Sequence, residues 1–372
     1  MSGGHVAKAS TVYDVAAHSG VSIATVSRVL RRPGDVRAST RERVLASVRE
    51  LGYVPSAAAR GLAASRTGVL GLYFPSLDAM EELGDAEFLP APGAPLVDLV
   101  VDMPDSGVVR PPNLYFDEVL RGSEFEAWRQ GFALMVGVGR GTNPTDMVGD
   151  IAGRVDGMAI LAQSVSAEVL EHVSRRIPVV LIAGPRRGDD FDHVSVGNTE
   201  GMQALTTHLI DGCAVTDFAY VAGPVDSPDD AERHAGFVAA LHSRGLDPAQ
   251  VPVHRGEFSR LRGRAVASTL LDGRRMPRAV VCANDQMALG VLDVLGAHGV
   301  SVPGDVIVTG FDGIEAGRQA SPRLTTVRQP MVDLGRAAMR AILSRLENPD
   351  QAPISLRLPV KVLLRESSEG HL

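Results

Sequence analysis

Short apolar runs recur along the chain from residue 69 onward, and stretches with helical spacing separate them. The runs cover residues 69–74, 133–138, 157–161, 179–183, 218–222, 279–283 and 306–310. Fully apolar strands that alternate with helices are typical of a parallel sheet that helices cover on both faces. Because about 300 residues exceed the usual size of one compact core, the pattern predicts an α/β body of two similar lobes with a cleft between them.

The first 54 residues follow a different pattern, with three short amphipathic stretches. Thr11 and Asp14 have the spacing of a capping box, and the helix that they begin should end at the next glycine. Ser22 can cap a second helix, and a second capping-box spelling at 39–42 precedes a third helix that should end at Gly52. Three short helices with a tight turn between the first two predict a helix-turn-helix.

The second helix can be divided into an inward and an outward face at about 100° per residue. The inward stripe consists of the apolar side chains Ile23, Val26, Val29 and Leu30, whereas the outward side chains are Ala24, Ser27 and Arg28. An outward arginine can bond both guanine acceptors in a DNA major groove, and Ala24 and Ile23 can meet thymine methyl groups. Ser22 and Thr25 are suited to phosphate contacts. The alternative is a helical hairpin whose outward face is only solvated.

Residues 55–64 form a helix-prone segment that is too short to be stable alone in water. Pro55 is suited to the first position of a helix, and Gly61 costs about 1 kcal/mol relative to alanine. A leucine on a helix of small residues, here Leu62, can approach a minor groove and wedge between base pairs. The alternative is a linker that contains a stray leucine.

Charge is divided unequally between the two regions. Residues 1–68 contain ten lysines and arginines and four acids, whereas the remainder contains 27 bases and 40 acids. A basic head on an acidic body is the asymmetry expected when one end of a chain meets phosphate and the other has a separate task.

The stretches TVYDVAAHSGVSIATVSRVL and TRERVLASVRELGYVPSAAARGLA resemble the DNA-binding head and hinge helix of the lactose-repressor and galactose-repressor family. The resemblance continues over nearly the whole chain, notably in ANDQMALGVL, VPGDVIVTGFDG and SPRLTTVRQP. It implies a helix-turn-helix head at 1–54, a hinge helix and linker at 55–68, and a periplasmic-binding-protein-like core at 69–372 for effector binding and dimerisation. Arg31 and Arg37 depart from the residues common in the family.

The resemblance also implies roles for individual residues. Base-reading positions fall on Ile23, Ala24 and Arg28, backbone-contacting positions on Ser22 and Thr25, and minor-groove positions on Ser56, Ala59 and Leu62. Effector-contacting positions fall on Tyr115, Phe116, Arg233, Phe258, Asn284 and Asp312. An aromatic face beside aspartate and arginine suits a sugar, because the ring covers C–H groups and the charged groups bind hydroxyls. For Phe258, simple core packing is the alternative.

Residues 76–112 interrupt the α/β pattern with eight acids, one base and six prolines. This composition predicts an exposed, partly disordered loop, within which residues 96–101 could form a short edge strand. The insertion could act as a lid or a protein-contact arm near the cleft, or could simply be a tolerated insertion. Its acidity argues against DNA contact.

Two other classes of protein compete with a DNA-binding regulator. For an enzyme, the glycines at 137, 139 and 141 approach a dinucleotide loop, but the third is one position early for G-x-G-x-x-G. There is no phosphate-loop or G-x-S-x-G spelling, and the ten histidines are never closer than eight residues apart, so no helix presents a zinc-binding histidine pair. For an exported sugar-binding protein, a signal would be needed where the basic head stands.

The sequence therefore predicts a cytoplasmic, non-enzymatic repressor without cofactor or metal. Its partners would be double-stranded DNA with a pseudo-palindromic operator, a sugar-like effector and a second copy of the chain, but no membrane. A dimer is expected because the last residues carry no apolar heptads. The cysteines Cys213 and Cys282 should be small core residues. Whether the effector releases or promotes DNA binding stays open.

Overall fold

The structure, a computed structural model, describes residues 10–31, 33–53, 66–75, 97, 114–139, 143–184, 188–273 and 275–369. It divides into two compact units, residues 1–68 and residues 69–372. Three predicted DNA contacts, Ser56, Ala59 and Leu62, lie outside the described residues, and so does the insertion 76–112 except for Val97. Each unit has a hydrophobic core of its own.

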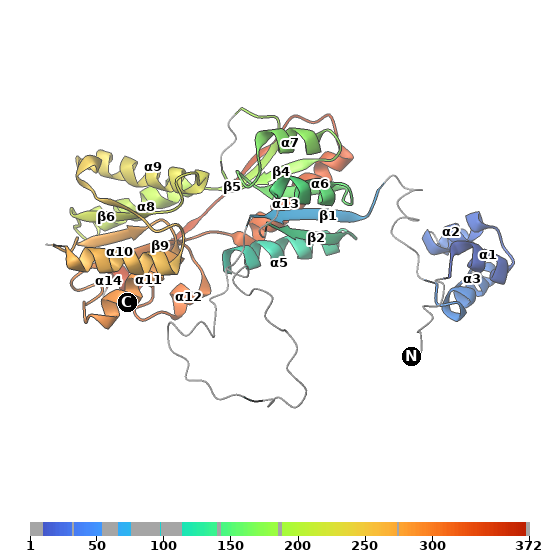
Figure 1. The fold of residues 1–372 in the computed structure, drawn as a ribbon, viewed down its shortest axis with the longest axis horizontal. Helices are drawn as coiled ribbons and strands as arrows, with labels where there is room; N and C mark the ends of the chain where they lie inside the picture. The colour runs from blue at the N-terminus through green and yellow to red at the C-terminus, as the bar shows by residue number, and fades with distance from the viewer. Residues whose placement is uncertain are drawn as a thin grey trace. The chain divides into compact units, whose positions relative to one another are not determined.

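The first unit, dark blue in Figure 1, contains α1 (Val12–Ser19), α2 (Ile23–Arg31), the 3-10 turn η1 (Pro33–Asp35) and α3 (Ala38–Glu50). The capping box of α1 is present as predicted, because the Thr11 hydroxyl accepts from the Asp14 N–H and the Asp14 carboxylate accepts from the Thr11 N–H. The Ser22 hydroxyl accepts from the Thr25 N–H at 3.2 Å and so caps α2. The three helices pack around Val15, Val26, Val29 and Val44, which confirms the helix-turn-helix.

The second predicted capping box is wrong. Helix α3 begins at Ala38, and its N-cap residue Arg37 makes no side-chain cap hydrogen bond. Ser39 and Thr40 therefore lie inside the first turn rather than before it. The apolar face predicted for this helix is nevertheless the one that packs inward, with Val44 fully buried.

The second unit contains two six-stranded sheets within the described residues. In the first lobe the strand order is β11-β5-β4-β3-β1-β2, and in the second lobe it is β12-β10-β9-β8-β6-β7. The first lobe uses β1 (Val69–Phe74), β2 (Ala133–Val138), β3 (Gly157–Leu161), β4 (Val179–Ile182), β5 (Asp192–Val196) and β11 (Ser355–Leu358). The second uses β6 (Phe218–Ala222), β7 (Val253–Arg255), β8 (Ala279–Cys282), β9 (Ile307–Asp312), β10 (Thr325–Arg328) and β12 (Lys361–Leu363).

All seven predicted strands are present, and five further strands, β5, β7, β10, β11 and β12, were not predicted. Strand pairing is parallel throughout except between β10 and β12, which run antiparallel. The two-lobed α/β prediction is therefore confirmed. One boundary matters for the site: β9 continues to Asp312, so this residue ends the strand rather than following it.

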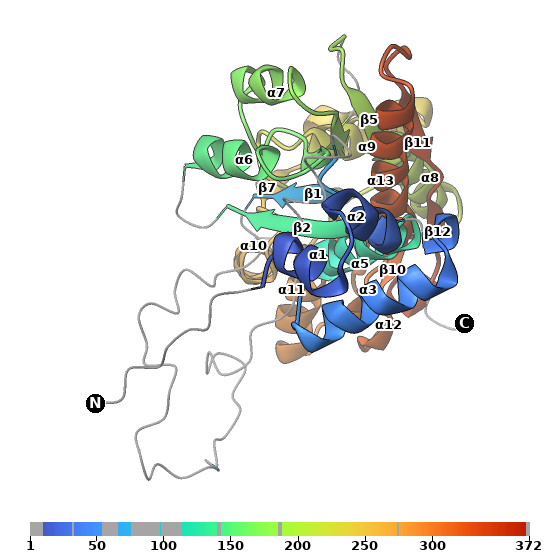
Figure 2. The ribbon, with the colours of Figure 1, turned by 90° about the vertical axis from the view of Figure 1, so that its right-hand side faces the viewer.

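Helices cover both faces of each sheet (Figure 1), and the end-on view shows this for the first lobe, with α6 and α7 on one side and α5 on the other (Figure 2). The first lobe carries α5 (Leu114–Arg129), α6 (Pro144–Ala152), α7 (Ala167–Ser174) and α13 (Met331–Glu347). The second carries α8 (Asn198–Asp211), α9 (Pro228–Ser243), η3 (Pro248–Gln250), α10 (Arg260–Asp272), α11 (Asp285–Ala297), α12 (Glu315–Gln319) and α14 (Glu366–Glu369). Helices α6 and α7 pack with Tyr73 of β1, whereas α5 and α13 pack with its neighbours Leu72 and Phe74, because successive strand residues point to opposite faces.

The chain passes between the two sheets three times: after β5, after β10 and between β11 and β12. Each crossing is short. Because the strands are parallel, the carboxyl ends of β1, β3 and β4 lie at one edge of the first sheet, and those of β6, β8 and β9 at one edge of the second. These two edges face each other. Ligands of such sheets bind beyond the carboxyl ends of the strands.

Candidate functional site

A cavity of about 460 Å³ lies between the lobes at these strand ends. Residues of both lobes line it, among them Gln163 after β3 and Ala183 after β4 on one side, and Asp229 at the start of α9 on the other. All six predicted effector residues line this one cavity: Tyr115, Phe116, Arg233, Phe258, Asn284 and Asp312. The structure thus brings together residues that are almost 200 positions apart in the sequence.

Arg233 is held rigidly beside the cavity and is only 3% exposed. Its Nη1 donates to the Ala283 carbonyl at 2.7 Å, and its Nε donates to Asn198 Oδ1 at 2.9 Å. Nη1 also lies 3.4 Å from Asp312 Oδ1, and the guanidinium stacks over the Phe311 ring at 4.0 Å. A buried charge with this many partners keeps a single orientation.

Asp312 occupies a strained position at the end of β9, with φ of 118°. Its Oδ1 accepts from Gln329 Nε2 at 2.7 Å, so the second chain crossing fixes the carboxyl group. Burial raises the pKa of Asp312 to about 6, although Arg233 and the Gln329 hydrogen bond favour the carboxylate. The neighbouring Asp285 accepts from the N–H groups of Gly313 and Ile314 and thereby holds the turn that follows.

Asn284 and Phe258 are linked by a hydrogen bond. Asn284 caps α11 by accepting from the Met287 N–H at 3.0 Å, and its Nδ2 donates to the Phe258 carbonyl at 3.2 Å. The Phe258 ring is half-buried and packs on Gly223, where a Cβ would lie 2.3 Å from a ring carbon. The Phe258 ring therefore lines the cavity, as predicted for an effector contact, and it also packs against the protein, as the core-packing alternative predicted.

Backbone strain is concentrated at the cavity. Six described non-glycine residues have a positive φ, and five of them line it: Gln163, Ala183, Glu257, Phe258 and Asp312. Left-handed backbone costs energy for such residues and occurs mostly where function requires a particular orientation. This clustering supports the cavity as a binding site.

Sequence reasoning missed three residues that organise the cavity. Asn198 bonds Arg233 through its oxygen and Asp229 through its nitrogen at 2.9 Å, and Asp229 also accepts from the Gly184 N–H of the first lobe at 3.3 Å. The third is Gln329, the partner of Asp312. A local sequence signal could have pointed to Asp229, because Ser227 is the N-cap of α9 and acidic residues are favoured in the first turn of a helix. For Asn198 and Gln329 only the three-dimensional arrangement reveals the role.

The outward face of α2 carries the side chains predicted to read DNA. Ser22, Ala24 and Arg28 are exposed, and Ile23 is 39% exposed, whereas Thr25 is half-buried with its hydroxyl 2.9 Å from that of Ser22. Of the stripe predicted to face inward, Val26 and Val29 are at most 1% exposed and Leu30 packs against the same core. The prediction is wrong for Ile23, which is the first residue of α2 and is exposed, and Ser27, predicted to face outward, is half-buried. The arrangement leaves an exposed arginine on a rigid helix, as major-groove reading requires.

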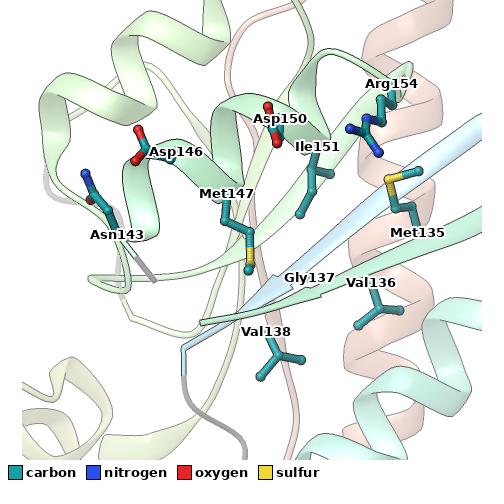
Figure 3. Close-up of a pocket in the computed structure, with 10 residues that line it drawn as sticks. All are labelled: Met135, Val136, Gly137, Val138, Asn143, Asp146, Met147, Asp150, Ile151 and Arg154. Carbon is teal, nitrogen blue, oxygen red and sulfur yellow. The ribbon is translucent and has the colours of Figure 1, made fainter. Parts of the chain in front are cut away.

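A second hollow, of about 550 Å³, lies at the outer edge of the first lobe between β2 and α6 (Figure 3). It includes Gly137, the first glycine of the dinucleotide-like spelling. Asp146 and Asp150 of α6 also line it, and Asp146 lies in the first turn of the helix. Phosphate binding needs free N–H groups and positive potential at a helix start, so these acids do not fit the dinucleotide reading.

The geometry can be compared with known proteins. Residues 11–56 match the family described as bacterial regulatory proteins, lacI family, and residues 207–368 match the periplasmic binding protein-like domain. The chain is 30% identical over 363 residues to the HTH-type transcriptional repressor PurR of Vibrio parahaemolyticus, covering 96% of this chain and 98% of that protein. It is 28% identical over 365 residues to catabolite control protein A of Priestia megaterium, covering 96% and 99%.

Solved structures give the same result. The lac repressor dimer bound to operator and the anti-inducer ONPF matches with a TM-score of 0.78 at 25% identity, over 97% of this chain and 99% of that one. The complex of the transcriptional regulator CelR with cellobiose matches with a TM-score of 0.66 at 28% identity, over 96% and 99%.

A helix-turn-helix unit joined to a two-lobed core with an inter-lobe cavity defines a ligand-responsive, DNA-binding transcriptional regulator. PurR, which matches over 98% of its length, is a transcriptional repressor. The chain belongs to the lacI family. None of the helices within the described ranges has the length and apolar character needed to cross a membrane.

Proposed function

We propose that the chain represses transcription as a homodimer, that α2 of each copy reads one half of a pseudo-palindromic operator, and that a sugar-like effector in the inter-lobe cavity controls binding. The observation that supports this most strongly is the convergence of all six predicted effector residues on one cavity, in a chain with an exposed reading helix. The proposal assigns the chain no catalytic reaction and, as for any regulator that acts on operator DNA, a place in the cytoplasm.

The DNA-reading part rests on α2. Arg28 would contact a guanine edge, Ala24 and Ile23 would meet thymine methyl groups, and Ser22 and Thr25 would bind phosphates. Ser56, Ala59 and Leu62, outside the described residues, would enter the minor groove at a flexible central base step.

The dimer would form through an apolar surface of the first lobe. On α5, Trp128 is 67% exposed and Phe125 44%, and the neighbouring edge strand β2 adds Val136 at 40%. The ring centroids of Phe125 and Trp128 lie 6.1 Å apart. An exposed aromatic surface of this kind suits a self-complementary interface between two copies, and the lac repressor with the same fold is a dimer bound to operator.

The effector class follows from the charges around the cavity. Among the residues that the structure describes, the acids Asp226, Asp229, Glu257 and Asp312 line it together with one base, Arg233, which pairs with Asp312. Phosphorylated or carboxylated ligands would meet net repulsion. A neutral polyol fits better, with hydroxyls on the acids and C–H faces on the aromatic rings, and the similar regulator CelR binds cellobiose.

The switch would be a population shift between lobe arrangements. The lobes already touch where Gly184 N–H donates to Asp229 and where a methyl-sized group on Gly184 would meet Pro228. A ligand that bonds Asp312 in one lobe and lies against Tyr115 in the other would favour one spacing of the lobes. That spacing would decide whether the paired hinge segments at 55–64 can form helices.

The experiment is selection of genomic DNA fragments by the purified full-length protein, repeated with neutral, amino-substituted and phosphorylated sugars. We expect a shared pseudo-palindrome whose recovery changes with a neutral sugar and not with a phosphorylated one. Recovery of random fragments would overturn the DNA-reading part. An operator that no ligand affects, with no ligand shifting thermal stability, would overturn the sensing part.

A further inference from the structure

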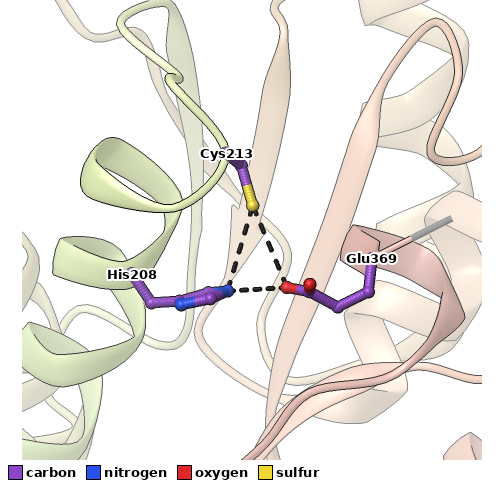
Figure 4. A group of neighbouring side chains, drawn as sticks. All are labelled: His208, Cys213 and Glu369. Atoms are coloured by element: carbon purple, nitrogen blue, oxygen red, sulfur yellow. Dashed lines mark hydrogen bonds and ion pairs between the residues drawn. The ribbon is translucent and has the colours of Figure 1, made fainter. Parts of the chain in front are cut away.

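Three side chains with metal-binding chemistry meet in the second lobe, and none of them lines the effector cavity (Figure 4). His208 lies near the end of α8, Cys213 follows that helix directly, and Glu369 ends α14. His208 Nε2 lies 2.6 Å from Glu369 Oε1, Cys213 Sγ lies 3.9 Å from Nε2, and Sγ lies 4.0 Å from Oε1. The sequence predicted core roles for both cysteines: Cys282 is buried in the core, and Cys213 is half-buried and packs against its edge.

The arrangement differs from a nucleophile with its base. In a cysteine–histidine–acid relay the two partners use different ring nitrogens, so that the acid orients the imidazole and the other nitrogen takes the thiol proton. Here the thiol and the carboxylate both approach Nε2 of His208. Three donor atoms that converge on one point are arranged as ligands of a common ion.

The distances are close to those of a tetrahedral zinc site. Bonds of about 2.0 Å to nitrogen and oxygen and 2.3 Å to sulfur place ligand atoms about 3.3 to 3.6 Å apart. The present separations are 2.6, 3.9 and 4.0 Å, so metal binding would lengthen the first by about 0.7 Å and shorten the other two by about 0.4 Å. A thiolate, a carboxylate and a neutral imidazole would balance the two charges of the ion.

The backbone around the cluster is fixed. Gly212 leaves room for the His208 ring, because a Cβ there would lie 2.9 Å from its Cε1. Helix α14 is tied to the sheet by Ser367, whose hydroxyl donates to the Val308 carbonyl at 2.6 Å. The side chains of His208 and Glu369 remain 29% and 25% exposed, which gives an ion access and leaves space for a fourth ligand.

We propose that His208 Nε2, Cys213 Sγ and Glu369 Oε1 bind a zinc ion that ties α14 to the end of α8. This mixed nitrogen, sulfur and oxygen set favours zinc and its neighbours in the first transition series over magnesium or calcium, which take oxygen ligands. The site is separate from the effector cavity, so the proposal does not depend on the identity of the effector.

The test uses the tag-free, full-length, reduced protein after treatment with a chelator. Zinc is titrated in competition with a chromophoric chelator, and cobalt serves as a spectroscopic substitute. We expect one equivalent of zinc and, with cobalt, a thiolate charge-transfer band together with the visible bands of a tetrahedral ion. Cys213→Ser should abolish the charge-transfer band.

His208→Ala and Glu369→Gln should each weaken zinc binding by more than the roughly tenfold loss that even outer partners of metal ligands cause. Matched controls are Cys282→Ala, the other cysteine, and Glu366→Gln on the same helix as Glu369; both should bind zinc as the unaltered chain does. Binding that is undetectable in the unaltered chain, or that is unchanged in Cys213→Ser and His208→Ala, would overturn the proposal.

Discussion

Replacing Asp312 with asparagine should make the ligand-free protein more stable at neutral pH. Burial raises the pKa of this carboxyl group from 3.8 to about 6. The folded state therefore holds the proton to a higher pH than the unfolded state does. The corresponding stability is fully present below about pH 4 and is lost as the pH rises through about 6. Because Asp285 titrates together with Asp312, the cost of the ionised carboxylate is on the order of 1 kcal/mol.

Asparagine has the same shape as the neutral acid, tolerates the positive φ and can still accept from Gln329. Because it cannot ionise, Asp312→Asn should be more stable at about pH 7.5, by on the order of 1 kcal/mol after the lost pairing with Arg233, and little changed at about pH 4. The response to the effector should be lost, because the carboxylate is a predicted ligand contact. Binding sites commonly contain groups that lower the stability of the ligand-free protein.

A matched control should change in the opposite direction. Asp293 lies on α11 and faces Arg260 and Arg264 of α10. Burial opposes its charge, but hydrogen bonds from these two arginines lower its pKa below the usual value. Asp293→Asn should therefore lose stability at about pH 7.5, and the loss should shrink as the pH falls through the folded pKa. The measurement is the urea midpoint of the three proteins at the two pH values. If Asp312→Asn is less stable than the unaltered protein at about pH 7.5, or if its difference does not depend on pH, the reasoning about this carboxyl group is refuted.

Three further predictions concern DNA binding and assembly. Arg28→Ala should cost about 1 to 3 kcal/mol at one base pair in competition binding to single-base operator variants; an equal loss on every duplex would make Arg28 a phosphate contact. Leu62→Ala should reduce operator bending in a gel assay of circularly permuted fragments, and an unchanged bend argues against a wedge. Trp128→Glu should shift the sedimentation of the protein from dimer to monomer because it places a charge in the apolar surface; an intact dimer would assign the interface elsewhere.

Local sequence signals predicted the elements that depend on them. The capping box at Thr11 and the apolar strands β1 and β6 appear as expected because their partners are near in sequence or their burial is complete. Strand β5 escaped prediction because it buries polar groups: Asp192 pairs with Arg345 of α13, 153 positions away. A buried polar strand has no apolar run to detect.

In the candidate site, too, some residues could be predicted from the sequence and others could not. The family resemblance predicted Asn284 and Asp312, and both lie at the carboxyl ends of parallel strands, β8 and β9, where ligands bind in such sheets. The network that orients these residues includes Asn198 after the first chain crossing and Gln329 in the second, and the spacing of the two in the sequence carries no periodic signal. Helix α3 is the opposite case. The sequence has a capping-box pattern that starts at Ser39, yet the helix begins at Ala38 and no side chain caps it.

A paired helix-turn-helix head should read one sequence, and the inter-lobe cavity should control that binding. Both can be measured together by fluorescence anisotropy of a selected operator and a scrambled duplex of equal length, at one salt concentration, with and without a neutral sugar found by the selection. The operator should bind at least about a thousandfold more tightly than the scrambled duplex, and the sugar should change the affinity for the operator alone. Equal, salt-sensitive binding to both duplexes, unaffected by the sugar, would contradict both expectations.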